Sequence, residues 1–269
     1  HSGIRQGDSL SPMPFNIIMD VIIKKVGLRN GYHLGDTEIK ILCHADDPVI
    51  IAEDENDLQR LLHTFYTTAK KYNMIISTDK TKCMTTSKEP LRCKLEINGE
   101  VIKQEMKFKY LGINITSYGN VEEEVREQVS KASKVAGCLN DLIWRNQHLK
   151  QETKTRIYKT AIRPIMTYTA ETRPDTSKTK KLLETTEMKI LRRISGKTLM
   201  DRERNENIRQ MCKTESINDW VLKRKQEWNQ HINRMGEDRL VRIARDKSPN
   251  GRRSTGRPRK RWSDNLDHG

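Results

Sequence analysis

A change of hydrophobic periodicity near residue 117 constrains the fold of this chain more than any other feature. Before it, short runs with two-residue alternation are interleaved with two runs of helical spacing. After it, helical spacing dominates to about residue 236. A region of strands and helices followed by a region of helices alone predicts an α+β fold with more than one domain.

The upstream region is expected to hold two helices and a set of short strands. Ser11 and Pro12 suit the N-cap and first position of a helix that ends near Gly27. A second helix is predicted over about 55–72, where large apolar side chains recur at helical spacing. Strands are predicted over 38–44, 48–53, 74–87 (two strands around a turn at 78–80) and 108–116, with a hairpin at Asn98-Gly99.

The downstream region is expected to be helical. Helices are predicted over 121–145, 151–163, 178–195 and 216–235, with Pro164 and Pro174 as breaks between them. The chain has 34% hydrophobic and 32% charged residues, so much of each helix should face solvent.

The charge balance predicts a polyanionic partner. The formal net charge is +15 and the sequence pI is about 9.6. Lys and Arg side chains on nucleic acid release condensed counterions, which favours nucleic acid over the alternative of a membrane surface, since the chain has no long apolar run. The five cysteines include no Cys-x-x-Cys pair, which is typical of reduced thiols in an intracellular protein of the nucleus or cytoplasm.

The basic charge is concentrated near the carboxyl end. Residues 239–261 contain ten Lys or Arg and one acid, Asp246. A nucleic-acid contact, a minor-groove hook around Gly256-Arg257-Pro258 and a solvated or nuclear-import run are the alternative interpretations. The predicted nucleic-acid-binding residues are Arg252, Arg253, Arg257, Arg259, Lys260 and Arg261.

Asp46 and Asp47 form the candidate catalytic and metal-binding pair. They lie at a predicted turn between two short strands, where adjacent carboxylates repel each other unless a cation is present. Hard divalent ions such as Mg²⁺ prefer oxygen ligands of this kind. The alternative is ordinary turn chemistry, in which Asp is common for backbone reasons alone.

Four motifs in this order resemble the reverse transcriptases of non-LTR retrotransposons. Arg5-Gln6-Gly7 before Leu10-Ser11-Pro12 resembles the family's palm motif that opens a helix, and His44-Ala45-Asp46-Asp47 resembles its Tyr/Phe-Ala-Asp-Asp motif. The segments 72–82 and Phe108-Lys109-Tyr110-Leu111-Gly112 resemble the next motif and the primer-grip hairpin. The tail from Gly256 to Asp264 resembles the tails of animal elements of this kind.

The resemblance implies a role for each matching residue. Asp46 and Asp47 would bind two catalytic Mg²⁺ ions, and Lys80 would lie near the triphosphate, unless it is a solvated turn lysine. Arg5, Gln6 and Gly7 would lie against the incoming nucleotide and template, where the absence of a Cβ at Gly7 permits close approach. The primer end would be held by Phe108, Tyr110, Leu111 and Gly112, whose alternative role is strand packing.

The resemblance also implies a domain order and an activity. Residues 1–116 would form a partial antiparallel palm sheet backed by two helices, 117–200 a helical thumb, and 201–269 a basic helical extension. Partners would be an RNA template, a DNA primer and deoxynucleotides. The family's first catalytic Asp would lie upstream of residue 1, so we expect the chain alone to polymerise poorly; His44 and Pro48 also depart from the motif. A non-enzymatic nucleic-acid-binding remnant and an inert product are the alternatives.

Overall fold

The computed structural model describes residues 9–27, 30–86, 91–248, 256, 258 and 260–266, which contain both helices and strands. The chain divides into two compact units, and each is described by itself. Unit 1 comprises residues 1–119 and 246–253, and unit 2 comprises residues 120–245 and 254–269. The mixture of helix and strand confirms the α+β expectation at the level of fold class.

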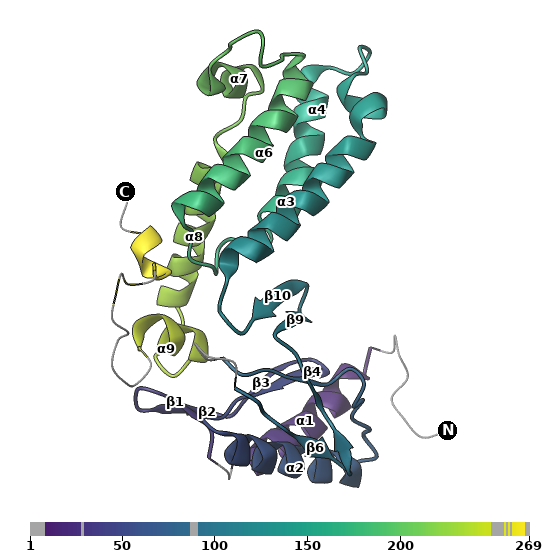
Figure 1. Ribbon diagram of the computed structural model, residues 1–269, viewed down its shortest axis with the longest axis vertical. Coiled ribbons are helices and arrows are strands. Elements are labelled where there is room, and N and C mark those ends of the chain that lie inside the picture. The colour runs from purple at the N-terminus through teal and green to yellow at the C-terminus, as the bar shows by residue number, and fades with distance from the viewer. Residues whose placement is uncertain are drawn as a thin grey trace. The chain divides into compact units, whose positions relative to one another are not determined.

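Unit 1 is built around two α-helices, and both were predicted. α1 spans Pro12–Val26 with Gly27 as its C-cap, and α2 spans Glu55–Lys71, where the Asp54 side chain accepts a hydrogen bond from the Asp57 amide. The helices lie against each other (Figure 1). Their shared core is made of Met19, Ile22, Val26, Leu61, Phe65 and Ala69.

The strands of unit 1 are short and pair in twos. They are β1 (Tyr32–Leu34), β2 (Thr37–Ile39), β3 (Ile41–His44), β4 (Asp47–Ile50), β5 (Lys82–Cys83), β6 (Glu96–Ile97), β7 (Glu100–Val101), β8 (Lys103–Gln104), β9 (Lys107–Tyr110) and β10 (Ile113–Thr116). Antiparallel pairs are β1–β2, β3–β4, β6–β7 and β9–β10, and β5–β8 is parallel. Among the described residues of unit 1, these pairs replace the single antiparallel sheet that we expected.

Three strand predictions are wrong in detail. The run 108–116 is not one strand, because the chain turns at Leu111-Gly112 and forms β9 and β10. The run 38–44 is broken at Lys40, because β2 turns back on β1 through Gly35, which has a φ of +59°, while β3 pairs with β4. Residues 74–77 form no strand; Met74 and Ile76 instead pack on the core between α1 and α2. The Asn98-Gly99 hairpin is confirmed, with φ values of +52° and +81° at the two turn residues.

A second apolar cluster of unit 1 joins α2 to the segment 83–102. It contains Leu62, Cys83, Cys93, Leu95, Ile97 and Ile102. The Sγ atoms of Cys83 and Cys93 lie 3.4 Å apart, a proximity that their sequence spacing did not indicate. Burial and the neighbouring Cys93 thiol raise the pKa of Cys83 to about 12, so Cys83 stays a thiol near neutral pH.

Unit 2 is helical as predicted, with additional breaks and short elements. Its helices are α3 (Val121–Cys138), α4 (Gln151–Ile157), α5 (Arg163–Met166), α6 (Ser177–Ser195), α7 (Asn205–Met211) and α8 (Ile217–Asn233), with π-helical turns η1 (Asn140–Trp144) and η2 (Tyr158–Ile162) and a 3₁₀ turn η3 (Ser263–Asn265). α9 (Leu240–Asp246) follows α8. α7 and α9 have seven residues each, too few for a clear apolar period, and were not predicted.

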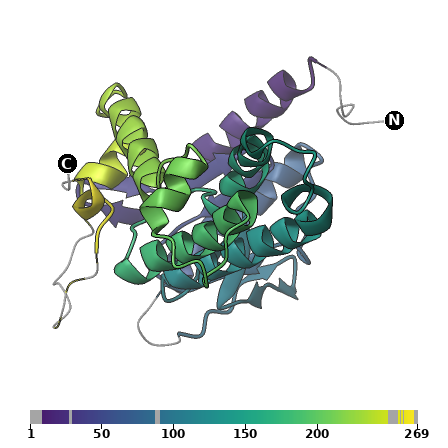
Figure 2. The same ribbon diagram turned by 90° about the horizontal axis from the view of Figure 1, so that it is seen from above.

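One apolar core runs through unit 2. α3 and α6 lie side by side in both views (Figures 1 and 2). Their buried faces meet Trp144, Tyr158 and Met166, and Ile208 and Ile217 complete the same cluster. The packing therefore continues across residue 200. None of the helices in the described ranges is both long and apolar enough to cross a membrane.

Candidate functional site

The hairpin β3–β4 presents Asp46 and Asp47 at its tip. His44 pairs with Asp47, so Ala45 and Asp46 form a two-residue turn. Ala45 has a φ of +51°, a left-handed conformation that costs a non-glycine residue of order 1 kcal/mol. Both carboxylates are exposed. The structure therefore confirms the turn and places strain directly before the acidic pair.

The other end of this hairpin is fixed in the core of unit 1. Ile41 and Ile50 pair with each other and pack against the α1–α2 cluster. The ladder continues beyond them, where the Ile51 amide donates to the Lys40 carbonyl oxygen at 2.9 Å. A buried base and an exposed tip position the carboxylates without burying their charge.

Pro48 is compatible with this hairpin. Hydrogen-bonded and non-hydrogen-bonded pairs alternate along an antiparallel ladder. The bonded Lys40–Ile51 pair puts His44–Asp47 in a bonded position and Cys43–Pro48 in a non-bonded one. No ladder donor is needed at residue 48, so the proline does not disrupt the pairing.

The hairpin β9–β10 reaches the same turn through Tyr110. The Tyr110 hydroxyl donates to the Asp47 carbonyl oxygen at 2.9 Å, across 63 residues of sequence. Burial first, and then the negative charge of Asp47, raise the pKa of Tyr110. The hydroxyl therefore keeps its proton and remains a donor. This contact joins two of the four sequence motifs at one place.

The β9–β10 hairpin itself turns at Leu111 and Gly112, with φ values of +48° and +86°. Two successive positive φ values are typical of the turn that best matches strand twist, although leucine is an unusual choice for it. Leu111 and Gly112 are exposed, while Phe108 is half-buried opposite Ile115. The strand-packing role considered for Phe108 therefore fits the structure.

Replacing Tyr110 with phenylalanine should weaken the link between the two hairpins. Loss of one neutral hydrogen bond is expected to destabilise unit 1 by about 0.5–1.5 kcal/mol. Urea unfolding curves would measure this. Tyr72→Phe is the matched control, because Tyr72 is an exposed tyrosine at the end of α2 whose hydroxyl has no described partner. Equal effects of the two changes would contradict the assigned role.

The turn can supply some of the ligands of a metal site. Mg²⁺ is often held by one or two carboxylates, with water and substrate phosphates as the other ligands. Asp46 and Asp47 match that donor set in kind and exposure. Within the described residues, no group of three or more acidic, His or Cys side chains is arranged to hold a metal. The turn thus offers two adjacent carboxylates as candidate ligands.

Lys80 is not brought to this pair by any described interaction. It lies exposed in the turn 78–80 after α2, and within the described ranges its ammonium forms no hydrogen bond or ion pair. The neighbouring Lys82 ammonium donates to the Asp79 carbonyl oxygen at 2.5 Å. The structure confirms the turn but does not test the predicted role of Lys80.

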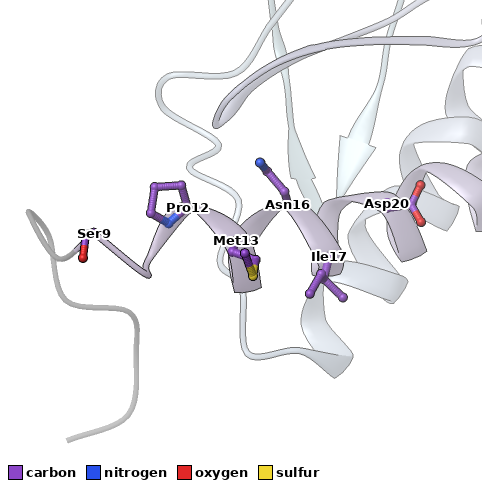
Figure 3. Close-up of a pocket in the computed structure, with 6 residues that line it drawn as sticks. All are labelled: Ser9, Pro12, Met13, Asn16, Ile17 and Asp20. Atoms are coloured by element: carbon purple, nitrogen blue, oxygen red, sulfur yellow. The ribbon is translucent and has the colours of Figure 1, made fainter.

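Arg5, Gln6 and Gly7 lie outside the described residues. The helix they precede carries a shallow pocket lined by Ser9, Pro12, Met13, Asn16, Ile17 and Asp20 (Figure 3). Met13 and Ile17 point to the same side of α1 and are 66% and 61% exposed. The pocket includes neither Asp46 nor Asp47, so it marks an apolar surface and not the acidic turn.

Comparison with known proteins connects these motifs to a family. Residues 1–115 match the model of the reverse transcriptase (RNA-dependent DNA polymerase) family. Relatives include the Pol polyproteins of the type-1 element R2 of Nasonia vitripennis and the type-2 element R2DM of Drosophila melanogaster, each 30% identical over 46–47% of this chain. Residues 1–115 of this chain are therefore similar to the reverse transcriptases of non-LTR retrotransposons.

The chain aligns with very different fractions of the lengths of its relatives. The matched region spans 13% of the length of each of the two R2 polyproteins. A putative uncharacterized transposon-derived protein of Caenorhabditis elegans is 25% identical over 84% of this chain and 83% of its own length. The similarity to that relative thus extends well beyond the segment that matches the reverse transcriptase family.

The basic tail of the chain ends in a set of polar contacts with residues 171–175 of unit 2, which we call the clasp. The indole nitrogen of Trp262 donates to the Glu171 carbonyl oxygen at 2.7 Å. Asn265 is buried, and its amide accepts from the Asp175 amide at 2.7 Å and donates to the Asp175 carbonyl oxygen at 3.1 Å. Trp262 therefore lies at the start of η3, and its indole N–H is used in a hydrogen bond within unit 2.

The predicted nucleic-acid-binding residues lie directly before this clasp. Lys260 and Arg261 are exposed, and the Arg261 amide donates to the Asp264 carboxylate at 2.8 Å. Arg252, Arg253, Arg257 and Arg259 lie outside the described residues. The clasp itself was missed by sequence reasoning, because it joins residues about 90 positions apart that follow no local pattern.

Proposed function

We propose that this chain is the carboxy-terminal portion of an RNA-directed DNA polymerase that copies an RNA template onto a DNA primer. The observation that supports this most directly is the hydrogen bond from Tyr110 to Asp47, which brings the primer-grip motif against the acidic turn. The similarity to the reverse transcriptase family suggests the reaction class, and we assign the acidic turn and the β9–β10 hairpin as two components of its site.

Each residue then has a defined task in the proposal. Asp46 and Asp47 would hold Mg²⁺, and that ion, when bound, supplies charge stabilisation at the transferring phosphoryl group. Tyr110 fixes the backbone of the turn. Phe108 to Gly112 would lie along the primer end, and Lys80 would counter the triphosphate charge. Arg5, Gln6 and Gly7 would contact nucleotide and template. Residues 1–116 would correspond to palm, 117–200 to thumb and 201–269 to a basic extension.

A non-enzymatic nucleic-acid-binding protein is the second candidate. The number of possible metal ligands favours this candidate. The turn provides two carboxylates, and no third acidic, His or Cys side chain among the described residues is placed to bind the same ion. It is also compatible with the net charge of +15. This candidate predicts that binding of nucleic acid is indifferent to the acidic turn.

Magnesium-dependent binding of a primer–template separates the two candidates. Without Mg²⁺, the exposed carboxylates repel the phosphate backbone; with it, they attract that backbone through the ion. We expect Mg²⁺ to raise the affinity for an RNA–DNA primer–template about 5- to 150-fold at constant ionic strength, the usual range of coupling between two ligands. Fluorescence anisotropy with Mg²⁺ or with EDTA measures this ratio.

Variants of the turn provide the decisive comparison. Asp46→Asn and Asp47→Asn should each reduce the Mg²⁺ effect and should raise the affinity measured in EDTA. Asp79→Asn is the control, because Asp79 is an equally exposed acid in a different turn of unit 1. Binding that is strong, independent of Mg²⁺ and unchanged by the Asp46 substitution would support the non-enzymatic candidate and reject the polymerase proposal.

A further inference from the structure

Cys83 and Cys93 form a pair of buried thiols in the second apolar cluster of unit 1. Cys83 ends β5, and Cys93 lies in the segment that leads to β6. Their Sγ atoms lie 3.4 Å apart, whereas the sulfur atoms of a disulfide are about 2.05 Å apart, so an approach of about 1.4 Å would suffice for a bond. Both cysteines are free in this structure. The pair is therefore a dithiol whose sulfur atoms are already close to bonding distance.

Gln104 holds the two cysteine-bearing segments together from a third strand. Its backbone pairs with Cys83 across the parallel β5–β8 ladder. Its side-chain oxygen accepts from the Cys93 amide at 3.0 Å, and its side-chain amide donates to the Leu91 carbonyl oxygen at 2.6 Å. The proximity of the two thiols is thus maintained by the backbone pairing and by the Gln104 side chain, without a covalent bond.

Ordinary apolar packing is the alternative explanation for buried cysteines, because a thiol behaves as a small hydrophobic group. Cys212 shows that behaviour in unit 2. It is 2% exposed, and its sulfur contacts the Gln151 side-chain amide at 3.6 Å and the Leu191 carbonyl oxygen at 3.7 Å. The Cys83 thiol instead donates its hydrogen bond to the sulfur of Cys93. The pair therefore has a reactive neighbour that Cys212 lacks among the described residues.

The two thiols of the pair differ in their readiness to react. Burial, the neighbouring Cys93 thiol and the negative charge of Glu55 raise the pKa of Cys83 to about 12, so Cys83 holds almost no thiolate at neutral pH. Cys93 is also buried, but its neighbours Arg92 and Lys94 are exposed, so little of the structure has to open to admit a small oxidant. We therefore assign the first reaction to Cys93 and the second to Cys83.

We infer that Cys83 and Cys93 are a peroxide-sensitive dithiol whose reversible disulfide stabilises unit 1. The Cys93 thiolate attacks one oxygen of hydrogen peroxide, the O–O bond breaks, and the other oxygen leaves as water after taking up the thiol proton. The Cys83 sulfur then attacks the sulfenic acid at Cys93, and the hydroxyl leaves as water with the Cys83 proton. In total, two thiols lose two electrons, and one peroxide becomes two water molecules. This inference goes beyond the proposed function and does not depend on it.

The disulfide would close a loop between residues that are 10 positions apart. Such a cross-link removes conformational freedom mainly from the unfolded chain. For a loop of this length, the equilibrium constant for folding of unit 1 should rise about 100-fold. The segment after Cys93 is bound to α2, through the Lys94 amide to the Glu55 carboxylate at 2.8 Å and the Glu96 amide to the Gln59 side chain at 2.9 Å. The amides of α2 therefore report the change.

Peptide mapping of the full chain tests the inference. The background variant Cys43→Ser/Cys138→Ser removes the two exposed thiols, which would otherwise link separate molecules. After treatment with hydrogen peroxide, we expect a peptide with Cys83 joined to a peptide with Cys93, and dithiothreitol should separate them. Cys212 should form no disulfide.

Stability is measured on the same oxidised and reduced samples. Hydrogen exchange of the α2 amides across a urea series should give a folding equilibrium constant about 100-fold larger for the oxidised chain. Tryptophan fluorescence provides the internal control, because all four tryptophans are in unit 2. The unfolding that it reports should change little on oxidation.

Single substitutions in this background separate the two steps. Cys83→Ala removes the second step, so dimedone, a reagent for sulfenic acids, should label Cys93 after peroxide treatment. Cys93→Ala should give no label at Cys83, because the high pKa of Cys83 leaves it as a thiol. Cys212→Ala is the matched control and should leave the cross-link unchanged. If either substitution of the pair prevents folding, the mapping of the background variant decides the question alone.

Three results would overturn the inference. The first is sulfinic acid at Cys83 or Cys93 without the cross-link, which would show that each thiol is oxidised separately. The second is a cross-link that forms only in urea, which would show that the native fold keeps the sulfur atoms apart. The third is an oxidised chain whose unit 1 is no more stable than that of the reduced chain, which would reject the stabilising role.

Discussion

Replacing Asp175 with asparagine is expected to destabilise unit 2 by roughly 3–5 kcal/mol, because two buried cations lose their shared counter-charge. The Asp175 carboxylate lies 2.7 Å from the Lys225 ammonium and 3.4 Å from the Arg173 guanidinium. The side chains of Asp175, Lys225 and Arg173 are 3%, 1% and 8% exposed, so water cannot replace the lost carboxylate. The substitution changes charge at nearly constant volume, which isolates the electrostatic effect.

The loss should depend on pH in a defined direction. Burial lowers the pKa of Lys225 and of Arg173, and Asp175 opposes that effect in both. Without the carboxylate, the folded-state pKa of Lys225 falls further below its unfolded value. The unfolded chain then binds more protons than the folded chain in that window, so stability of the variant rises with pH. Urea unfolding should therefore show a smaller difference in unfolding free energy between the wild-type chain and Asp175→Asn at about pH 10 than at about pH 7.

Two further variants control this prediction. Asp141→Asn removes an exposed acid that pairs with Arg145 on the surface of the same unit, and should cost less than about 1 kcal/mol. Asp175→Asn combined with Lys225→Met removes the buried ammonium as well, and should be more stable than Asp175→Asn alone. If the double variant lost as much unfolding free energy as Asp175→Asn and Lys225→Met lose when each is measured alone and the two losses are added, direct coupling between Asp175 and Lys225 would be contradicted.

The buried ionic groups show where sequence reasoning reached its limit in this chain. Helical spacing predicted α3, α6 and α8, because one apolar stripe on each is buried in a single core. Nothing in the local sequence distinguishes Lys225 from its exposed neighbours Lys223 and Arg224. Its partners lie 50 and 52 residues away, and only the packing of α8 against the segment 173–175 brings them together.

The acidic turn was predictable because the residues that form it are close together in the sequence. Asp46 and Asp47 lie between two apolar strand segments, so the hairpin follows from residues within about ten positions. The contact from Tyr110 could not be found in this way, although the motif resemblance placed Tyr110 in the same functional group. The turn at Leu111-Gly112 was also missed, since leucine is not a residue that predicts positive φ.

Strand pairing was the least predictable feature of the fold. The strands of unit 1 are two to four residues long, and the parallel pairing of β5 with β8 links residues 82–83 to residues 103–104. Such short ladders contribute few hydrogen bonds each, so their partners are determined by packing around Cys83, Leu95 and Ile102 and not by their own patterns. The lone Asn98-Gly99 signal was reliable because the turn itself fixes the register.

A second buried network in unit 2 should give an effect of similar size with the opposite pH dependence. The Arg209 guanidinium donates to Glu187 Oε2 at 3.2 and 3.3 Å and to Glu184 Oε1 at 3.0 Å. The Tyr158 hydroxyl donates to Glu187 Oε1 at 3.2 Å, and the Glu187 side chain is 1% exposed. Arg209→Met leaves this carboxylate buried without its cation, at a cost of roughly 3–5 kcal/mol.

The sign of the pH effect follows from the pKa of Glu187. Burial raises this pKa, and the charge of Arg209 opposes the rise. In Arg209→Met the folded-state pKa of Glu187 rises further above the unfolded value. The folded chain then holds a proton that the unfolded chain has released, so the variant loses stability as pH increases through this window. The loss of unfolding free energy in Arg209→Met, relative to the wild-type chain, should be smallest near about pH 5 and should grow toward about pH 8.

Matched variants separate this effect from lost packing. Arg126→Met removes an exposed arginine that pairs with Glu122 on α3 and should cost less than about 1 kcal/mol at either pH. Glu187→Gln combined with Arg209→Met removes the titrating group and should show no pH dependence in this window. With increasing pH, the stability of Asp175→Asn should rise and that of Arg209→Met should fall, although both changes are in unit 2. If the unfolding free energy of both variants changed with pH in the same direction, the buried-charge explanation of the two networks would be rejected.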